Sequence, residues 1–263
     1  MRPKLMGILN VTPDSFSDGG RHASLQQAIA AGLRLAEAGA DIIDVGGEST
    51  RPGAAEVPLE EEIRRTAPVV EALARQGLRV SIDTMKAGVM RAALDAGATM
   101  LNDVSALQAD PQSLPLAAAS GAQVVLMHMP GNPRTMQGLA EYRDVVAEVQ
   151  AALAARIAAA EAAGIPRARL IADPGIGFGK DMAQNLALMR ALEAFHALGV
   201  PLLLGASRKS LIPAVAGPAA PSERLPGSLA LALRGAEAKV AWLRVHDVAE
   251  TRQALALWEA IRP

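Results

Sequence analysis

Short apolar runs alternate with longer segments of helical apolar spacing along the whole chain. Eight such runs, rich in aliphatic and β-branched residues, predict β-strands, and most segments between them have the spacing of amphipathic helices. Because the runs are almost continuously apolar, they suit a parallel sheet that is covered on both faces. The predicted strands are Leu5–Asn10, Asp41–Gly47, Arg79–Thr84, Thr99–Ser105, Gln123–Met129, Arg169–Gly175, Pro201–Ser207 and Ala241–Asp247.

Three of the predicted helices end at a glycine. Gly39, Gly97 and Gly164 each close an alanine-rich segment just before the next strand, where a left-handed C-cap residue is favoured. The eight βα units fill 263 residues, close to the roughly 250 residues of one (β/α)₈ barrel. An open doubly wound sheet could also hold eight strands, but near-equal units from end to end favour closure. We therefore predict a single α/β domain, residues 1–263, folded as a (β/α)₈ TIM barrel.

Two connections are longer than the others. Residues 11–23 follow the first strand and residues 48–59 follow the second, and both segments are rich in Gly, Pro, Ser, Thr and Asp. Loops of this length in compact domains usually act as lids or binding loops. We expect both loops to be mobile and to take part in substrate binding.

Composition excludes several classes of function. A formal net charge of -1 gives no general field for a polyanion, so we expect no nucleic-acid partner. The absence of cysteine excludes disulfides, thiolate nucleophiles and sulfur-ligated metals. The sequence has no signal-peptide core, and its apolar stretches are far shorter than the ~20 residues of a membrane span. We expect a cytoplasmic protein without membrane contact.

Polar side chains follow nearly every predicted strand at its carboxyl end. In a (β/α)₈ barrel these ends meet at one mouth, where catalytic groups collect. Asp and Asn also end strands for structural reasons, as turn residues and helix caps, but agreement over eight strands favours a shared site. The residues concerned are Asn10, Asp44, Glu48, Asp83, Asn102, His128, Asp173, Ser207, Lys209, Arg244 and His246.

The cations of this set indicate a phosphorylated substrate. Lys209, Arg244 and His246 follow the last two strands, which is a frequent phosphate site in this fold. The alternative interpretation is a salt bridge at the barrel rim for Arg244 and a packed histidine for His246. The sequence has neither a His/Asp/Glu trio at metal-ligand spacing nor a Gly-x-Ser-x-Gly elbow, so metal hydrolysis and serine acyl transfer fit poorly.

A glycine-rich segment, GIGFGK, spans Gly175–Lys180. It is not a P-loop, because Pro174 stands where the first glycine is needed, and it is not a dinucleotide fingerprint, because Lys180 stands where the last glycine is needed. We expect its glycines to let the backbone approach a flat ligand closely, with Asp173 at the edge of the ligand and Phe178 nearby.

Eight strings, in chain order, resemble the motif set of the dihydropteroate synthase family. The first two are highly specific by themselves, whereas SIDT or NDVSA alone would be weak. The strings are NVTPDSFSDGG (10–20), GGESTRPGA (46–54), SIDT (81–84), NDVSA (102–106), MHMPGNPRTMQ (127–137), DPGIGFGK (173–180), GASRKS (205–210) and RVHDV (244–248).

The resemblance implies an enzyme of folate biosynthesis that joins a dihydropterin methyl diphosphate to 4-aminobenzoate and releases diphosphate. It also implies a homodimer, competition by sulfonamides at the 4-aminobenzoate pocket, and Asn10 as ligand of a Mg²⁺ ion that arrives with the diphosphate. The implied catalytic residues are Asp83, Asp173 and Lys209. The implied binding residues are Asp83, Asn102, Met127, Asp173, Phe178 and Lys209 for the pterin, Thr50, Arg244 and His246 for the diphosphate, and Phe16, Thr50, Arg51, Pro52, Phe178 and Ser207 for 4-aminobenzoate.

Two alternative functions stay open at this point. A pterin-dependent methyltransferase domain has a similar barrel and similar pterin-binding acids, but it needs neither a diphosphate site nor the SRKS and NVTPDSFSDGG strings. A catalytically silent pterin-binding paralogue would show erosion of the two long loops or of Lys209, Arg244 or His246. The sequence shows no such erosion.

Overall fold

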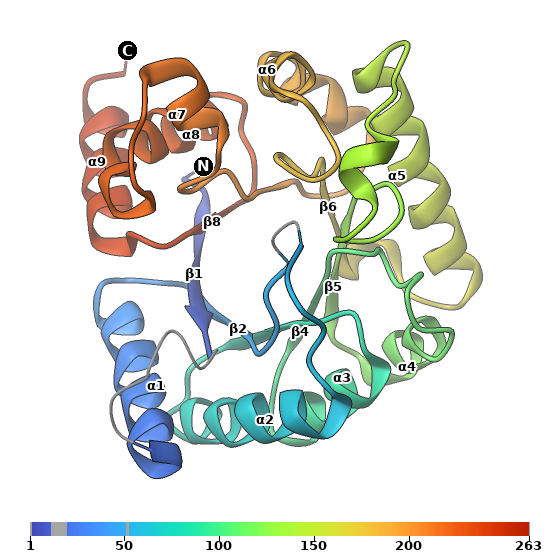
Figure 1. The fold of residues 1–263 in the computed structure, drawn as a ribbon, viewed down its shortest axis with the longest axis vertical. Helices are drawn as coiled ribbons and strands as arrows, with labels where there is room; N and C mark the ends of the chain where they lie inside the picture. Colours follow the sequence, from blue (N-terminus) through green and yellow to red (C-terminus); the bar gives the residue numbers. More distant parts are fainter. Residues whose placement is uncertain (1, 12–19, 51–52, 263) are drawn as a thin grey trace.

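The computed structural model describes residues 2–11, 20–50 and 53–262. Eight parallel strands form one sheet that curves into a ring, and the helices surround it (Figure 1). The strand order is β6-β5-β4-β3-β2-β1-β8-β7, and a bridge between Ala172 of β6 and Leu202, just before β7, joins the two ends of the sheet. The predicted (β/α)₈ barrel is therefore confirmed.

The eight predicted strands are all present, and most are shorter than predicted. The strand β7 has only two residues, because Pro201 has no N–H to donate and Gly205 has a low preference for strand structure. The strands are β1 Lys4–Asn10, β2 Ile42–Gly46, β3 Val80–Asp83, β4 Met100–Asp103, β5 Gln123–Met127, β6 Leu170–Asp173, β7 Leu203–Leu204 and β8 Trp242–Val245.

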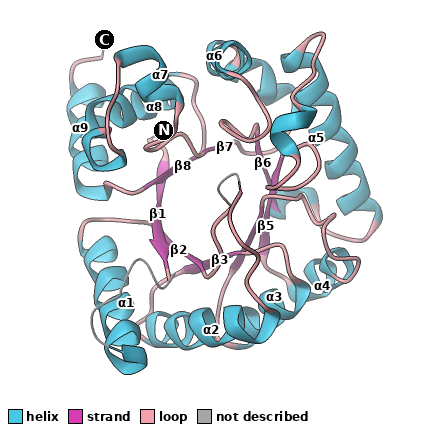
Figure 2. Ribbon diagram, in the orientation of Figure 1, coloured by secondary structure: helices cyan, strands magenta, loops and turns pink. Residues whose placement is uncertain are grey.

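Helices follow the strands and form the outer layer of the barrel (Figure 2). The α-helices are α1 Gly20–Glu37, α2 Leu59–Arg75, α3 Ala87–Asp95, α4 Ser113–Ser120, α5 Val145–Ala162, α6 Met182–Arg190, α7 Leu211–Ala216, α8 Leu225–Glu237 and α9 Val248–Ala260. The shorter 3₁₀ helices are η2 Met136–Leu139, η3 Arg167–Arg169, η4 Leu192–Leu198 and η5 Pro221–Glu223.

The helix ends agree with the sequence prediction in three places and differ in one. Gly39, Gly97 and Gly164 follow α1, α3 and α5 with φ angles of 98°, 105° and 93°, so the predicted left-handed glycines are confirmed. In contrast, α1 begins at Gly20, inside the segment predicted to be a loop up to residue 23. Composition misled here, because glycine is tolerated at a helix start as well as in loops.

The interior of the barrel is divided into an apolar floor and a polar mouth. Seven buried side chains pack together as the floor, and alternation along each strand turns every second residue to the same interior. On β2, β4, β6 and β8 the residue two positions beyond the floor residue is polar, namely Asp44, Asn102, Asp173 and Arg244. The floor consists of Met6, Ile42, Met100, Val125, Ile171, Leu203 and Trp242.

A second and larger apolar cluster lies between the strands and the helices and supports the barrel from outside.

Among the described residues, no helix combines the length and the apolar character that crossing a bilayer requires.

Candidate active site

Strand register brings three of the predicted site residues, Asn10, Asp83 and Asn102, into one row. Asn10 of β1 pairs with Gly46 of β2, Gly46 pairs with Asp83 of β3, and Asp83 pairs with Asn102 of β4. Gly46 leaves open space in this row, because a Cβ atom built on it would lie 3.6–3.7 Å from the side chains of Asp83 and Asn10. The first half of the barrel mouth is thus lined by amide and carboxylate groups.

Arg244 of β8 lies across the barrel interior and joins two buried carboxylates. Its Nη2 donates to Asp83 Oδ2 at 2.6 Å, and its Nε donates to Asp44 Oδ2 at 2.6 Å. Asp44 also accepts a hydrogen bond of 3.0 Å from Nδ2 of Asn102. The alternative interpretation of Arg244 as a salt bridge is confirmed, but its partners stand inside the barrel and not at the rim, since Asp44 is fully buried.

The burial of these charges changes their protonation. Burial raises the pKa of Asp83 to about 7, with Arg244 opposing and the carboxylate of Asp44 reinforcing the shift. Burial also works against the charge of Arg244, but Asp44 and Asp83 together raise the pKa of Arg244 above its usual value. Near neutral pH, Asp83 can therefore change its protonation state while Arg244 stays charged.

Asp173 at the end of β6 faces the same interior from the opposite side. Its Oδ1 accepts a hydrogen bond of 2.7 Å from the amide of Gly175, and a Cβ atom built on Gly205 would lie 3.6 Å from its Oδ2. Burial raises the pKa of Asp173, whereas the Gly175 amide, Lys209, Lys180 and Arg244 favour the carboxylate. Burial outweighs these groups, so the pKa of Asp173 stays above its usual value.

Lys209 covers the ring of Phe178 in the mouth. Its Nζ lies 3.9 Å from the ring centroid, within the range of a cation–π contact. A Cβ atom on Gly177 would stand 3.1 Å from Cδ of Lys209, so glycine gives the lysine room to pass over the loop. Asp173, Phe178 and Lys209, which were predicted to share the pterin site, are brought together by this arrangement.

The glycines of GIGFGK have a different purpose from the one predicted at two of three positions. Gly175, Gly177 and Gly179 all have positive φ. A Cβ atom on Gly175 would lie 2.1 Å from the carbonyl oxygen of His128, and one on Gly179 would lie 2.4 Å from Pro130. These two glycines admit the neighbouring β5–α5 connection rather than a ligand.

The ends of β7 and β8 are joined by a side-chain contact. Oγ of Ser207 lies 3.0 Å from Nδ1 of His246, and the same oxygen accepts a hydrogen bond from the His246 amide at 3.3 Å. Ser207 is buried, so its hydroxyl orients the imidazole from below. This places His246 next to the polar mouth, near the strand that carries Arg244.

The remaining predicted residues divide into two groups. Thr50 lines a small crevice together with Asp83 and Thr84, and Met127 is buried and paired in register with Asp173. The 4-aminobenzoate residues Phe16, Arg51 and Pro52 lie outside the residues that the structure describes.

Comparisons with known proteins decide the family. The sequence profile described as pterin binding enzyme matches residues 6–246. A curated dihydropteroate synthase of Escherichia coli K12 is 51% identical over 259 residues, covering 98% of this chain and 91% of its own length. The chain belongs to the dihydropteroate synthase family of pterin-binding enzymes.

Solved structures of this family are similar over the whole chain. A Xanthomonas albilineans dihydropteroate synthase with 4-aminobenzoic acid has a TM-score of 0.93 and 52% identity, covering 100% of this chain and 94% of that one. A Yersinia pestis dihydropteroate synthase in a sulfonamide drug complex has a TM-score of 0.92 and 46% identity, covering 98% of this chain and 94% of that one.

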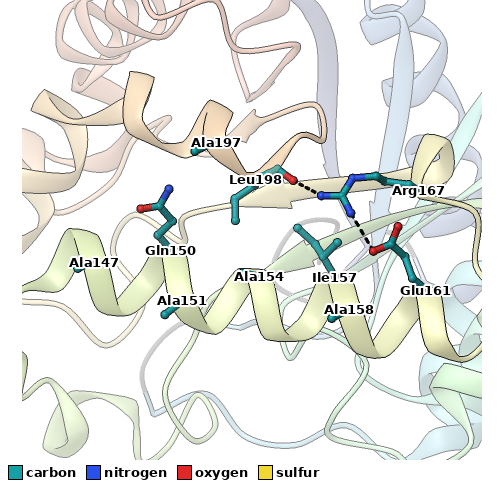
Figure 3. Close-up of a pocket in the computed structure, with 10 residues that line it drawn as sticks. All are labelled: Ala147, Gln150, Ala151, Ala154, Ile157, Ala158, Glu161, Arg167, Ala197 and Leu198. Carbon is teal, nitrogen blue, oxygen red and sulfur yellow. Dashed lines mark hydrogen bonds and ion pairs between the residues drawn. The ribbon is translucent and has the colours of Figure 1, made fainter.

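A groove of this dihydropteroate synthase family member lies away from the polar mouth. It has a volume of about 400 Å³ and runs between α5 and η4 (Figure 3). Alanines of α5 line it, and its charged members, Glu161 and Arg167, are paired with each other. None of the predicted site residues that the structure describes contributes to it, so the chemistry is assigned to the polar mouth.

A buried ion cluster that the sequence did not predict stands beside the mouth. Nζ of Lys86 donates to Glu48 at 2.5 Å, to Glu62 at 2.6 Å and to the carbonyl of Val57 at 2.7 Å. Glu48 also accepts a hydrogen bond from the amide of Val57. This bond joins the two ends of the connection between β2 and α2. A signal was present in the sequence, because Glu62 interrupts the apolar face of α2, where it is buried with Val69.

Replacement of Lys86 by Met is expected to lower the free energy of unfolding by about 3 kcal/mol, because Glu62 would stay buried without its cation. Urea unfolding measures the change. Arg75→Met is the matched control, since its partner Glu71 is exposed and such pairs contribute under about 1 kcal/mol. Equal effects of the two substitutions would show that the buried cluster carries no special stability.

Proposed function

We propose that this chain condenses (7,8-dihydropterin-6-yl)methyl diphosphate with 4-aminobenzoate to 7,8-dihydropteroate and diphosphate. The observation that carries the proposal is the polar mouth above the apolar floor. Asp83, Asn102 and Asp173 line it together with the cations Lys209 and Arg244, and all five stand in the strings that resemble the family.

Recognition of the pterin requires acceptors and donors in a fixed pattern. The amino-pyrimidinone edge presents N–H donors next to acceptors. In our proposal Asp83, Asn102 and Asp173 accept from the donors, Lys209 donates to an acceptor, and Phe178 and Met127 provide apolar contact. The 3.9 Å contact between Lys209 and the Phe178 ring supports this assignment, since it holds the ammonium over the mouth.

The diphosphate is assigned to Arg244, His246 and Thr50. Asn10 would contribute its amide oxygen to a Mg²⁺ ion, which fits a hard cation that takes its other ligands from substrate and water. The described residues contain no group of three or more His, Cys, Asp or Glu side chains that could hold a metal by themselves. The ion would neutralise charge on the diphosphate.

The reaction is proposed to begin with departure of the diphosphate. The C–O bond between the methylene carbon and the diphosphate breaks, and its electron pair leaves with the diphosphate, whose charge Arg244 and His246 stabilise. The carboxylates of Asp83 and Asp173 stabilise the cationic pterin methylene. The amine nitrogen of 4-aminobenzoate then attacks this carbon and loses a proton, so no protein nucleophile is needed.

The 4-aminobenzoate pocket is proposed to lie between the two long loops and the β6–α6 connection. Phe16, Thr50, Arg51, Pro52, Phe178 and Ser207 are its proposed walls. Closure of the loops would exclude water, which otherwise competes for the methylene cation. The sulfonamide complex of the Yersinia pestis relative supports the expectation that sulfonamides compete with 4-aminobenzoate here.

A coupled assay tests the function. The purified chain is mixed with the dihydropterin diphosphate, 4-aminobenzoate and Mg²⁺, and diphosphate and coupled product are followed together. Equal amounts of both would establish the synthase. Tight pterin binding without product would favour a silent paralogue, and methyl transfer from a methylated pterin to a corrinoid would favour the methyltransferase.

Binding of the pterin is expected to weaken as the pH falls below about 7. Asp83 must be ionised to accept from the pterin, and its pKa is raised to about 7 by burial. Below that pH a proton has to be released on binding, so affinity should fall by up to about tenfold per pH unit. Calorimetry from pH 5 to pH 9 measures it, and Asp83→Asn should remove the dependence. A flat profile in the unsubstituted protein would contradict the role of Asp83.

Three further assignments stay predictions. We infer one catalytic domain over residues 1–263, a cytoplasmic location and a homodimer. Light scattering of the purified chain tests the last of these, because a dimer doubles the scattering mass.

A further inference from the structure

Asp44 is a buried carboxylate that lies below the row in which Asn10, Gly46, Asp83 and Asn102 pair across β1 to β4. It stands on β2 two residues beyond Ile42 of the apolar floor and two residues before Gly46 of the mouth. Its side chain is fully buried. A ligand in the mouth would therefore meet the groups above Asp44 rather than Asp44 itself.

Both side chains that Asp44 contacts belong to the proposed substrate site. Its Oδ2 accepts from Nε of Arg244 at 2.6 Å and from Nδ2 of Asn102 at 3.0 Å. These two partners come from β8 and β4, on either side of β2 in the sheet order. One carboxylate oxygen thus links a proposed diphosphate residue to a proposed pterin residue.

The chemistry of a carboxylate fixes the orientation of Asn102. An ionised carboxylate only accepts hydrogen bonds, so the amide group of Asn102 must turn its NH₂ toward Asp44. Its Oδ1 is then directed away from Asp44. An asparagine held in this way offers an acceptor to N–H donors of a ligand, whereas the flipped amide would offer a second donor.

The same carboxylate fixes Arg244 independently of Asp83. The bond to Asp44 uses Nε, next to the stem, and the bond to Asp83 uses Nη2 at the tip. A pterin that engages Asp83 would compete for the second bond only. The bond from Nε to Asp44 would still hold the guanidinium across the barrel interior. Because the guanidinium is planar, this bond also restricts its rotation.

We propose that Asp44 is a positioning residue that sets the preference of the site for the pterin edge, by orienting the acceptor of Asn102 and anchoring Arg244 without touching the substrate. This inference rests on the proposed function. It explains why a fully buried charge stands in the barrel interior, where an apolar residue would otherwise extend the floor.

The first test replaces Asp44 by Asn, which keeps the shape and removes the obligate acceptor. Affinity for the dihydropterin diphosphate is expected to fall about tenfold to hundredfold, as for loss of hydrogen bonds to a charged group. The Michaelis constant for the second substrate, 4-aminobenzoate, should change less than about twofold, since the two side chains that donate to Asp44, Asn102 and Arg244, are not assigned to that pocket. Asp103→Asn is the matched control, because Asp103 is equally buried on β4 but bonds to Ser105 and Leu107.

A double-mutant cycle separates positioning from general damage. In the background of Asn102→Ala, the part of the Asp44→Asn effect that acts through Asn102 should vanish, so the two losses should not multiply. Losses that multiply, or an Asp44→Asn affinity within about twofold of the unsubstituted chain, would overturn the inference. Should Asp44→Asn not fold, Asp44→Ser leaves room for a water and a hydroxyl that can donate or accept, and the same loss of affinity is expected.

The outcomes also separate this inference from the proposed function. An unsubstituted chain that binds no pterin diphosphate and forms no product would contradict the proposed function. An active chain in which Asp44→Asn and Asp103→Asn behave alike would leave that function intact and refute the role of Asp44.

Discussion

Replacement of Asp173 by Asn is expected to lower kcat/KM by about a thousandfold while the barrel still folds. The carboxylate faces the mouth between Lys209 and Arg244, where it can stabilise the cationic methylene. Asparagine keeps an acceptor for the Gly175 amide, which Oδ1 of Asp173 binds at 2.7 Å, but it carries no charge. Single-turnover kinetics with saturating 4-aminobenzoate measures the chemical step directly.

The folding of Asp173→Asn should be close to normal for the same physical reason. Burial raises the pKa of Asp173, so at a pH above the usual pKa of aspartate an ionised Asp173 destabilises the folded state. A neutral amide removes this destabilisation. Thermal unfolding is the check. Asp144→Asn is the matched control, since Asp144 caps α5 on the outer layer and asparagine caps equally well. Near-normal turnover in Asp173→Asn would contradict its catalytic role.

The sequence was sufficient for the barrel because strand and helix signals agree over its whole length. The floor and the mouth lie on alternate residues of the same strands, such as Met100 and Asn102 of β4. The runs themselves are almost continuously apolar, so this alternation of floor and mouth residues becomes visible only in the structure. Strand length was harder to predict. Pro201 cannot donate a backbone hydrogen bond and Gly205 has a low preference for strand structure, so both shorten β7, and the apolar content of the segment indicates neither effect.

The candidate site was predictable as a set of residue types but not as a network. The sequence places Asp44 at a strand end but indicates no role for it, because its bond to Arg244 spans 200 positions of the chain. Glu62 interrupts the apolar face of α2 and is therefore unusual in the sequence, but its partner Lys86 was not predictable, since an ion pair between a loop and a helix has no fixed spacing. Gly175 and Gly179 were predicted to face a ligand, whereas the steric conflict that requires them comes from a neighbouring loop.

Replacement of Arg244 by Met is expected to reduce both activity and stability. Asp44 and Asp83 would lose their shared cation in the barrel interior, and removing one partner from a buried ion network costs about 3–5 kcal/mol. Loss of the charge that stabilises the departing diphosphate should lower kcat by about a hundredfold or more. Urea unfolding and steady-state kinetics measure the two effects. Arg234→Met, which removes an ion pair with the exposed Glu193, should cost under about 1 kcal/mol.

The pH dependence of Arg244→Met identifies the cause of its instability. Burial already raises the pKa of Asp83 to about 7, and Arg244 opposes that rise, so removing Arg244 should raise the pKa further. A carboxyl group whose pKa is higher in the folded than in the unfolded state contributes most to stability below its unfolded pKa. That contribution is lost as the pH rises through the folded pKa. The deficit of Arg244→Met should therefore be small at about pH 5, where Asp83 is protonated in both folded proteins, and larger at about pH 9, where only the unsubstituted protein holds Asp83 ionised beside a cation. A deficit that is equal at both values would mean that lost packing of the arginine stem, rather than uncompensated carboxylates, destabilises the barrel.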